Sequence, residues 1–207
     1  MPMVITPKVR FLHVPKTGGT WVVGALQASG VELSIVRRPA MSRVTLVEDH
    51  IGLDESPDLA DRFTIAFVRH PLTWWPSFWV YRRMTGWADD HPIDSCTQSD
   101  DFNEFIENVI TNLPGDLSRR FEAYVGTLSH PISFIGRYEQ LRDDLIDGLG
   151  HAGETFDERA IRTHAPENTG DYTTYTPRYT GSQEDRLAEA ERATIERFYG
   201  GVKSPPL

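Results

Sequence analysis

The chain has 207 residues, a length that fits one domain with a sizeable core. Its hydrophobic fraction of 39% and charged fraction of 25% are those of a globular protein and exclude a disordered one. The formal net charge of −9 argues against a nucleic acid or another polyanion as a partner. A single cysteine, Cys96, excludes an internal disulfide framework and a cysteine-based zinc site.

No apolar run is long enough to span a membrane, and the N-terminus lacks the basic and apolar regions of a signal peptide. We therefore expect a cytoplasmic protein without stable membrane insertion. We treat residues 1–207 as one domain, and the sequence leaves the oligomeric state open.

The first predicted element is a short buried strand over residues 9–14, which Pro15 ends because proline has no N–H for a sheet ladder. A helix is predicted over residues 21–29. Between strand and helix stand Gly18 and Gly19, which let the backbone turn tightly and approach a ligand closely.

A strand, a glycine loop and a helix N-terminus together favour an anion site, because unpaired N–H groups and the positive end of the helix dipole point to one place. Lys16 adds a full positive charge, and Thr17 and Thr20 add hydroxyl donors. The loop differs from the usual nucleoside-triphosphate pattern, in which the lysine follows the last glycine.

Residues 13–20, His-Val-Pro-Lys-Thr-Gly-Gly-Thr, resemble the 5′-phosphosulfate loop of the sulfotransferases that use 3′-phosphoadenosine 5′-phosphosulfate (PAPS). The likeness is to the loop of the carbohydrate-type enzymes. It implies that the donor is bound by seven consecutive residues: Pro15, Lys16, Thr17, Gly18, Gly19, Thr20 and Trp21.

Two short strands are predicted next, over residues 31–36 and 42–47. His50 follows the second of them, and ligands gather at the carboxyl ends of strands in open α/β sheets. The resemblance implies that His50 is the base that deprotonates the acceptor, a role that suits an imidazole. Glu48 or Asp49 could orient His50 or act as the base instead.

The clearest strand covers residues 63–68, a nearly continuous apolar run typical of a buried parallel strand. It leads into Arg69 and Pro71, and Ser77 stands eight residues after the arginine. This spacing resembles the 3′-phosphate motif of the same family. A guanidinium and a hydroxyl that converge on one phosphate are chemically suited to bind it.

An amphipathic helix is predicted over residues 101–113 and a second helix over 117–128. A strand over residues 132–136 leads into Tyr138, within a segment that resembles the family's Arg-Tyr-Glu-Asp-Leu motif. The resemblance implies that Tyr138 is a secondary contact of the nucleotide.

The Gly- and Thr-rich segment 164–180 resembles, loosely, the family's segment that closes over the donor. A helix is predicted over residues 181–199. The alternation of strands and helices indicates an α/β fold, a single three-layer domain with a central, mostly parallel sheet and helices on both faces. The resemblance implies that this is the P-loop-like sulfotransferase fold.

The predicted function is in-line transfer of the sulfuryl group from PAPS to a hydroxyl or amine, leaving adenosine 3′,5′-bisphosphate. Lys16 would be catalytic by neutralising the phosphosulfate, and His50 would activate the acceptor. Arg69 and Ser77 would select the 3′-phosphate. No metal is required, and the acceptor is a small molecule or a saccharide that the sequence does not identify.

Two alternatives stay open. One is a small nucleotide or metabolite kinase of the same fold that uses ATP and Mg²⁺, although the sequence lacks the usual lysine position. The other is a catalytically silent anion- or glycan-binding protein of the same fold, because fold alone does not prove activity.

Overall fold

The computed structural model describes residues 3–36, 62–129, 131–167 and 169–201. The chain divides into two compact units, and each is considered by itself. Within the described ranges, unit 1 holds residues up to Val36, residues 62–68 and the stretch from Phe121 to Glu167. Unit 2 holds residues 69–120 and the stretch from Thr169 onward.

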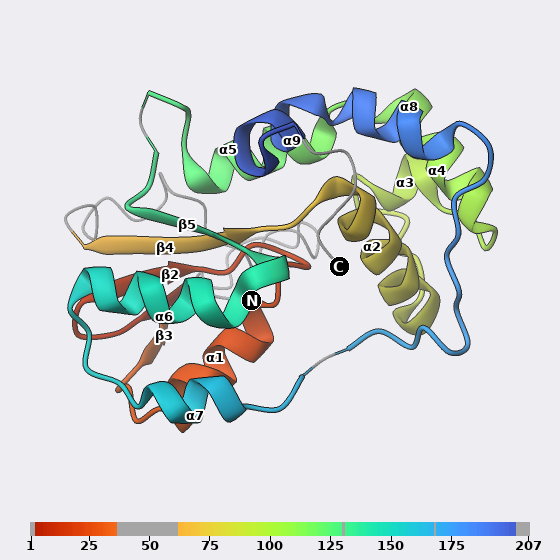
Figure 1. Ribbon diagram of the computed structural model, residues 1–207. Helices are drawn as coiled ribbons and strands as arrows, with labels where there is room; N and C mark the ends of the chain where they lie inside the picture. Colours follow the sequence, from red (N-terminus) through yellow and green to blue (C-terminus); the bar gives the residue numbers. More distant parts are fainter. Residues whose placement is uncertain (1–2, 37–61, 130, 168, 202–207) are drawn as a thin grey trace. The chain divides into compact units, whose positions relative to one another are not determined.

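Unit 1 is built on one five-stranded sheet in the order β3-β1-β2-β4-β5 (Figure 1). The strands are β1 (Met3–Ile5), β2 (Val9–Leu12), β3 (Ser34–Val36), β4 (Phe63–Val68) and β5 (Phe134–Arg137). The pairs β2–β4 and β4–β5 are parallel, whereas β1 runs antiparallel to both β2 and β3. The prediction of an α/β fold is therefore confirmed. The sheet is mixed and not mostly parallel as predicted, because β1 reverses direction and pairs antiparallel with both of its neighbours.

Two helices, α1 (Gly19–Ala28) and α6 (Leu141–Ala152), cover this sheet, and α7 (Glu158–Thr163) packs against both of them (Figure 1). Their apolar side chains form one core with those of the strands. The buried members are Val4, Val9, Phe11, Trp21, Val22, Ala25, Leu26, Val31, Ile65, Phe67, Leu145, Ile146, Leu149 and Ile161. Ile65 and Phe67 lie on one face of β4 and Ala66 and Val68 on the other, and all four side chains are fully buried, which explains why this strand is continuously apolar.

Unit 2 is helical. It contains α2 (Pro71–Thr85), α3 (Asp94–Thr97), α4 (Phe102–Asn112), the first half of α5 (Asp116–Val125), α8 (Gln183–Ala190) and α9 (Arg192–Tyr199). Its core is aromatic: Trp75 is fully buried, 4.9 Å from Trp74 and 6.1 Å from Phe105 between ring centroids. These contacts assign the Trp-rich stretch of α2 to packing. Among the described helices, none is both long and apolar enough to cross a membrane.

A buried carboxylate divides the helix predicted over residues 181–199. Glu191 ends α8 and precedes α9, and its carboxylate accepts hydrogen bonds from the backbone N–H groups of Leu117 (3.1 Å) and Ser118 (2.9 Å). It also accepts from the Ser118 hydroxyl at 2.8 Å. Glu191 thereby satisfies N–H groups at the start of α5 that have no partner inside that helix.

Glu191 makes the stability of the protein depend on pH. Burial raises its pKa to about 7 from an ordinary 4.5, although the hydrogen bonds from Ser118 and Leu117 oppose this rise. The native state therefore holds a proton that the unfolded chain has released, so stability falls as pH rises from about 4.5 to 7. The span of about 2.5 units corresponds to roughly 3 kcal/mol.

We expect Glu191→Gln to flatten this part of the stability profile, because an amide resembles the protonated acid and does not titrate. Urea unfolding between pH 4.5 and 8 measures the difference between the variant and the parent chain. Glu189→Gln, an exposed carboxylate that pairs with Arg192, is the control and should leave the slope unchanged. Parallel profiles for parent and Glu191→Gln would refute this explanation.

Candidate functional site

The loop between β2 and α1 is the first candidate site, in unit 1. Gly18 is the N-cap of α1, and its backbone is left-handed with a φ of 84°. Because glycine has no side chain, no side chain caps the start of this helix. The first turn of α1 also carries no acidic residue. Because the first N–H groups of a helix have no intrahelical partner, this start is suited to an anionic ligand.

Lys16 is held in an uncommon conformation inside this loop. Its φ of 63° makes it the one non-glycine residue with a positive φ in the described ranges. For an L-residue the left-handed region costs about 1 kcal/mol or more. The loop therefore holds this lysine in a turn that a glycine would adopt more easily, which is a pattern of strain that clusters at functional sites.

Two buried polar side chains, those of Thr17 and His13, pack against the backbone of the loop. The Thr17 hydroxyl donates to the carbonyl of Val14 at 2.9 Å and is almost completely buried. This bond stabilises the turn, so the predicted contact of the same proton with a phosphate oxygen would require the bond to open. The buried ring of His13 lies directly under Gly19, where a Cβ would stand 1.9 Å from Cδ2 of His13.

Tyr138 reaches the loop from the end of β5. It begins the 3₁₀ turn Tyr138–Gln140, and a Cβ built on Gly18 would lie 3.3 Å from its Cδ2 and 2.5 Å from Cδ2 of Leu141. The phenol ring therefore borders the start of α1. The structure thus places Tyr138 beside the glycine loop, and its contact with a nucleotide stays a prediction.

Trp21 is placed differently from the other loop residues. Its indole is 6% exposed and lies under the guanidinium of Arg142, whose Cζ is 5.6 Å from the ring centroid. The ring of His164 covers it as well, at 5.7 Å between centroids. A direct contact of Trp21 with the donor stays a prediction, and in this arrangement Arg142 forms the outer surface.

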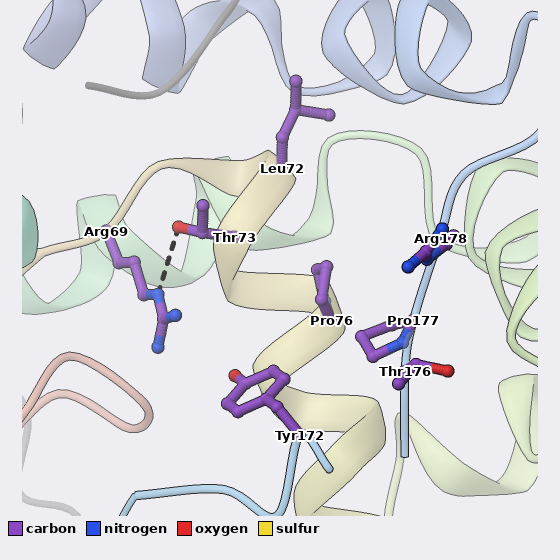
Figure 2. A pocket seen from close by; sticks show the side chains of 8 residues that line it. All are labelled: Arg69, Leu72, Thr73, Pro76, Tyr172, Thr176, Pro177 and Arg178. Carbon is purple, nitrogen blue, oxygen red and sulfur yellow. Dashed lines mark hydrogen bonds between the residues drawn. The ribbon is translucent and has the colours of Figure 1, made fainter. Parts of the chain in front are cut away.

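A second candidate site begins at Arg69, in unit 2. It directly follows β4, and its side chain is 8% exposed. Its Nε donates to the hydroxyl of Thr73 at 3.1 Å (Figure 2). That hydroxyl donates in turn to the carbonyl of His70 at 3.0 Å. Thr73 therefore fixes the guanidinium at the start of α2.

Ser77, the predicted partner of Arg69, lies one turn further along α2. It is buried, and the pocket beside Arg69 is lined by Thr73 and not by Ser77. Residues four apart share one helix face, which is why the spacing alone does not distinguish the two hydroxyls. A phosphate contact of Ser77 stays a prediction, and Thr73 is the hydroxyl that the sequence reasoning missed.

The pocket beside Arg69 has a volume of about 400 Å³ (Figure 2). Its lining comes from the first turns of α2 and from the Thr-rich segment before α8: Arg69, Leu72, Thr73, Pro76, Tyr172, Thr176, Pro177 and Arg178. The lining combines two guanidinium groups and several hydroxyls with apolar rings. Such a lining fits an anionic ligand that also carries a ring.

Pro76 explains how the C-terminal segment is fastened to α2. A proline inside a helix has no N–H for the carbonyl four residues earlier, which here belongs to Leu72. The phenol of Tyr179 donates to that carbonyl at 3.0 Å, and burial raises the pKa of Tyr179 well above its ordinary value. This bond places Thr176, Pro177 and Arg178, which directly precede Tyr179, at the pocket.

The exposed turn at residues 171–174 carries Tyr172, which lines the pocket. Asp171 accepts hydrogen bonds from the Thr173 hydroxyl (2.6 Å) and from the N–H groups of Thr173 and Thr174 (3.1 and 3.0 Å). The hydrogen bonds, led by that of the Thr173 side chain, lower the pKa of Asp171 to about 2. The turn therefore stays intact across the physiological pH range and holds Tyr172 at the pocket.

The predicted base His50, together with its alternatives Glu48 and Asp49, lies outside the described residues, as does the strand predicted over residues 42–47. The base assignment therefore stays a prediction. Comparisons of the chain with models of protein families, with curated proteins and with solved structures found no match.

Proposed function

We propose that this chain is a sulfotransferase of P-loop-like fold that transfers a sulfuryl group from PAPS to a hydroxyl or amine. The observation that carries the proposal is the loop of unit 1. Lys16 is held there in a left-handed turn immediately before a helix start that has no capping side chain and no acidic residue. A phosphosulfate matches this combination of a full positive charge with helix N–H groups.

The pocket of unit 2 supports the choice of nucleotide. Arg69 is buried, fixed by Thr73 and accompanied by Arg178, an arrangement suited to a doubly charged phosphate. PAPS carries a 3′-phosphate, which distinguishes it from ATP.

In the proposed reaction the acceptor oxygen or nitrogen attacks sulfur in line, and the bond between sulfur and the bridging phosphate oxygen breaks. The electron pair of that bond leaves with the 5′-phosphate of adenosine 3′,5′-bisphosphate. Lys16 and the N–H groups at the start of α1 would stabilise the charge that develops on this phosphate. The proton of the acceptor passes to a base, for which His50 stays the candidate.

Arg69→Ala tests the assignment of the 3′-phosphate. We expect the affinity for adenosine 3′,5′-bisphosphate to fall roughly 10- to 100-fold, the range for a lost hydrogen bond to a charged group. The affinity for adenosine 5′-monophosphate, which lacks the 3′-phosphate, should stay the same. Titration calorimetry with both nucleotides gives the two values.

Arg186→Ala is the matched control, because Arg186 is an exposed arginine of unit 2 that pairs with Glu107. It should bind both nucleotides like the parent chain. If Arg69→Ala lowered the affinity for both nucleotides equally, or lowered neither affinity, Arg69 would be excluded as the residue that binds the 3′-phosphate.

A further inference from the structure

Four side chains from three distant parts of unit 1 meet on one side of α1, one turn beyond the glycine loop. We name them the α1 flank cluster: Trp21, Arg142, His164 and Glu167. Arg142 covers the indole of Trp21 and donates from Nη2 to the carbonyl of His164 at 2.8 Å. Nε2 of His164 lies 2.7 Å from Oε1 of Glu167.

The cluster presses closely on the helix backbone. A Cβ on Gly24 would lie 2.4 Å from Oε1 of Glu167 and 2.7 Å from Nε2 of His164, so this pair fits only because residue 24 has no side chain. The side chains of Glu167 and His164 are 37% and 17% exposed. The carboxylate is therefore fixed in direction by the imidazole and still reaches solvent.

The place of the cluster fits the base of a bound nucleotide. Gly24 stands four residues after Thr20, which is about 6 Å along the helix at 1.5 Å per residue. A ligand whose 5′-phosphate sits at the start of α1 carries its ribose and base away from that point. The α1 flank cluster lies within the reach of such a base and offers it a planar cation and an oriented carboxylate.

We propose that the α1 flank cluster selects the base of the donor, and that it prefers a 6-aminopurine to a 6-oxopurine. This inference rests on the proposed function. The base stacks on the outer face of the Arg142 guanidinium, whose inner face lies on Trp21, because guanidinium planes stack well on aromatic rings. His164 is a positioning residue that holds the carboxylate of Glu167.

Glu167 supplies the discrimination. An ionised carboxylate only accepts hydrogen bonds. Facing the edge of the base that carries position 6 and N7, it pairs with the exocyclic amine of a 6-aminopurine and is repelled by the oxygen of a 6-oxopurine, and it does not meet the N1–H that a 6-oxopurine carries on its other edge. A site that is built to hydrogen-bond one group rejects an analogue that lacks it. Because Glu167 is partly exposed, we expect about a tenfold preference, close to the value of one net hydrogen bond.

The test compares adenosine 3′,5′-bisphosphate with inosine 3′,5′-bisphosphate, which differ at position 6 of the purine. The parent chain should bind the adenosine compound about tenfold more tightly in titration calorimetry. Glu167→Gln should bring the ratio close to one, because an amide both donates and accepts. Arg142→Lys keeps the charge but loses the planar surface, so it should weaken both compounds equally.

Glu158→Gln is the control, since Glu158 is an exposed carboxylate that pairs with Arg162 at the start of α7. It should keep the tenfold ratio. Equal binding of both compounds by the parent chain, or an unchanged ratio in Glu167→Gln, would overturn the base assignment and leave the proposed function standing. Binding of neither compound would overturn both. A purely structural role of the pair would lower the melting temperature of Glu167→Gln without moving the ratio, which also counts against the proposal.

Discussion

Replacing Lys16 with alanine should lower the rate of sulfuryl transfer at least about 100-fold, the loss typical of removing one group that stabilises the charge of a transition state. The donor affinity should fall as well, because the same ammonium group neutralises the ground-state phosphosulfate. The rate is measured as release of adenosine 3′,5′-bisphosphate from PAPS in the presence of a mixture of saccharide and small-molecule acceptors.

The backbone of Lys16 makes a sharper test possible. At a φ of 63°, alanine keeps the strain of the lysine, whereas glycine relieves it. Lys16→Gly should therefore be as inactive as Lys16→Ala. Its free energy of unfolding in urea should nevertheless be about 1 kcal/mol higher than that of Lys16→Ala. A loss of activity without a loss of stability separates the chemical role of the side chain from its place in the fold.

Lys8→Ala provides the control for charge. Lys8 is an exposed lysine of unit 1 whose Nζ donates to the carbonyl of Gly153 at the end of α6. Lys8→Ala removes one positive charge from the unit, as Lys16→Ala does, and should leave transfer unchanged. Full turnover in Lys16→Ala, or an equal loss in Lys8→Ala, would refute the assigned role of Lys16.

Gly19→Ala should be the most damaging single-methyl change in the loop. Gly19 has an ordinary helical backbone at the first position of α1, where alanine is favoured by propensity. Its Cβ would nevertheless lie 1.9 Å from Cδ2 and 2.1 Å from Nε2 of His13. That ring is buried and stacks on Phe11 at 6.3 Å, so it has little room to move aside.

We expect Gly19→Ala to cost about 1–3 kcal/mol of unfolding free energy, the usual range for overpacking a buried contact. The loop must also shift, so the affinity for adenosine 3′,5′-bisphosphate should fall. His13→Ala removes the obstructing ring, and the double variant should therefore be more stable than the sum of the two single changes predicts. Urea unfolding of the four chains measures this coupling.

Gly150→Ala is the matched control, because Gly150 lies in α6 of the same unit and no atom stands within 4 Å of its potential Cβ. It should be neutral or stabilising by up to about 1 kcal/mol. If the losses of unfolding free energy in His13→Ala and Gly19→Ala simply added up in the double variant, the two residues would not be in the contact that the structure indicates.

Local sequence patterns predicted those elements that are stabilised by their own hydrophobic runs and chain breakers. The apolar run of residues 63–68 becomes β4, and the periodic apolar residues of the predicted helix 101–113 become α4, Phe102–Asn112. The strand β1 was missed because three residues are too short for a periodic signal. It exists through its antiparallel pairing with β2 and β3, which is a tertiary effect.

Other differences arise from contacts between distant residues. The predicted helix 181–199 divides at Glu191 because its carboxylate binds the start of α5, more than seventy positions earlier in the chain. Arg142 and Glu167 carry no local signal for the site, since their relation to Trp21 and Gly24 depends on how α6 and α7 pack on α1. The loop around Lys16 was predictable because strand, glycines and helix are consecutive in the sequence.

The most direct test of the proposed donor is thermal unfolding of the parent chain with adenosine 3′,5′-bisphosphate, compared with ATP in the presence and absence of Mg²⁺. A native-state ligand at a hundredfold excess over its Kd adds about 2.7 kcal/mol, or roughly 5–10 °C for a chain of this size. We expect such a shift with the bisphosphate alone, independent of Mg²⁺. A shift only with ATP and Mg²⁺ would contradict it in favour of a kinase, and no shift with either nucleotide would indicate a catalytically silent protein.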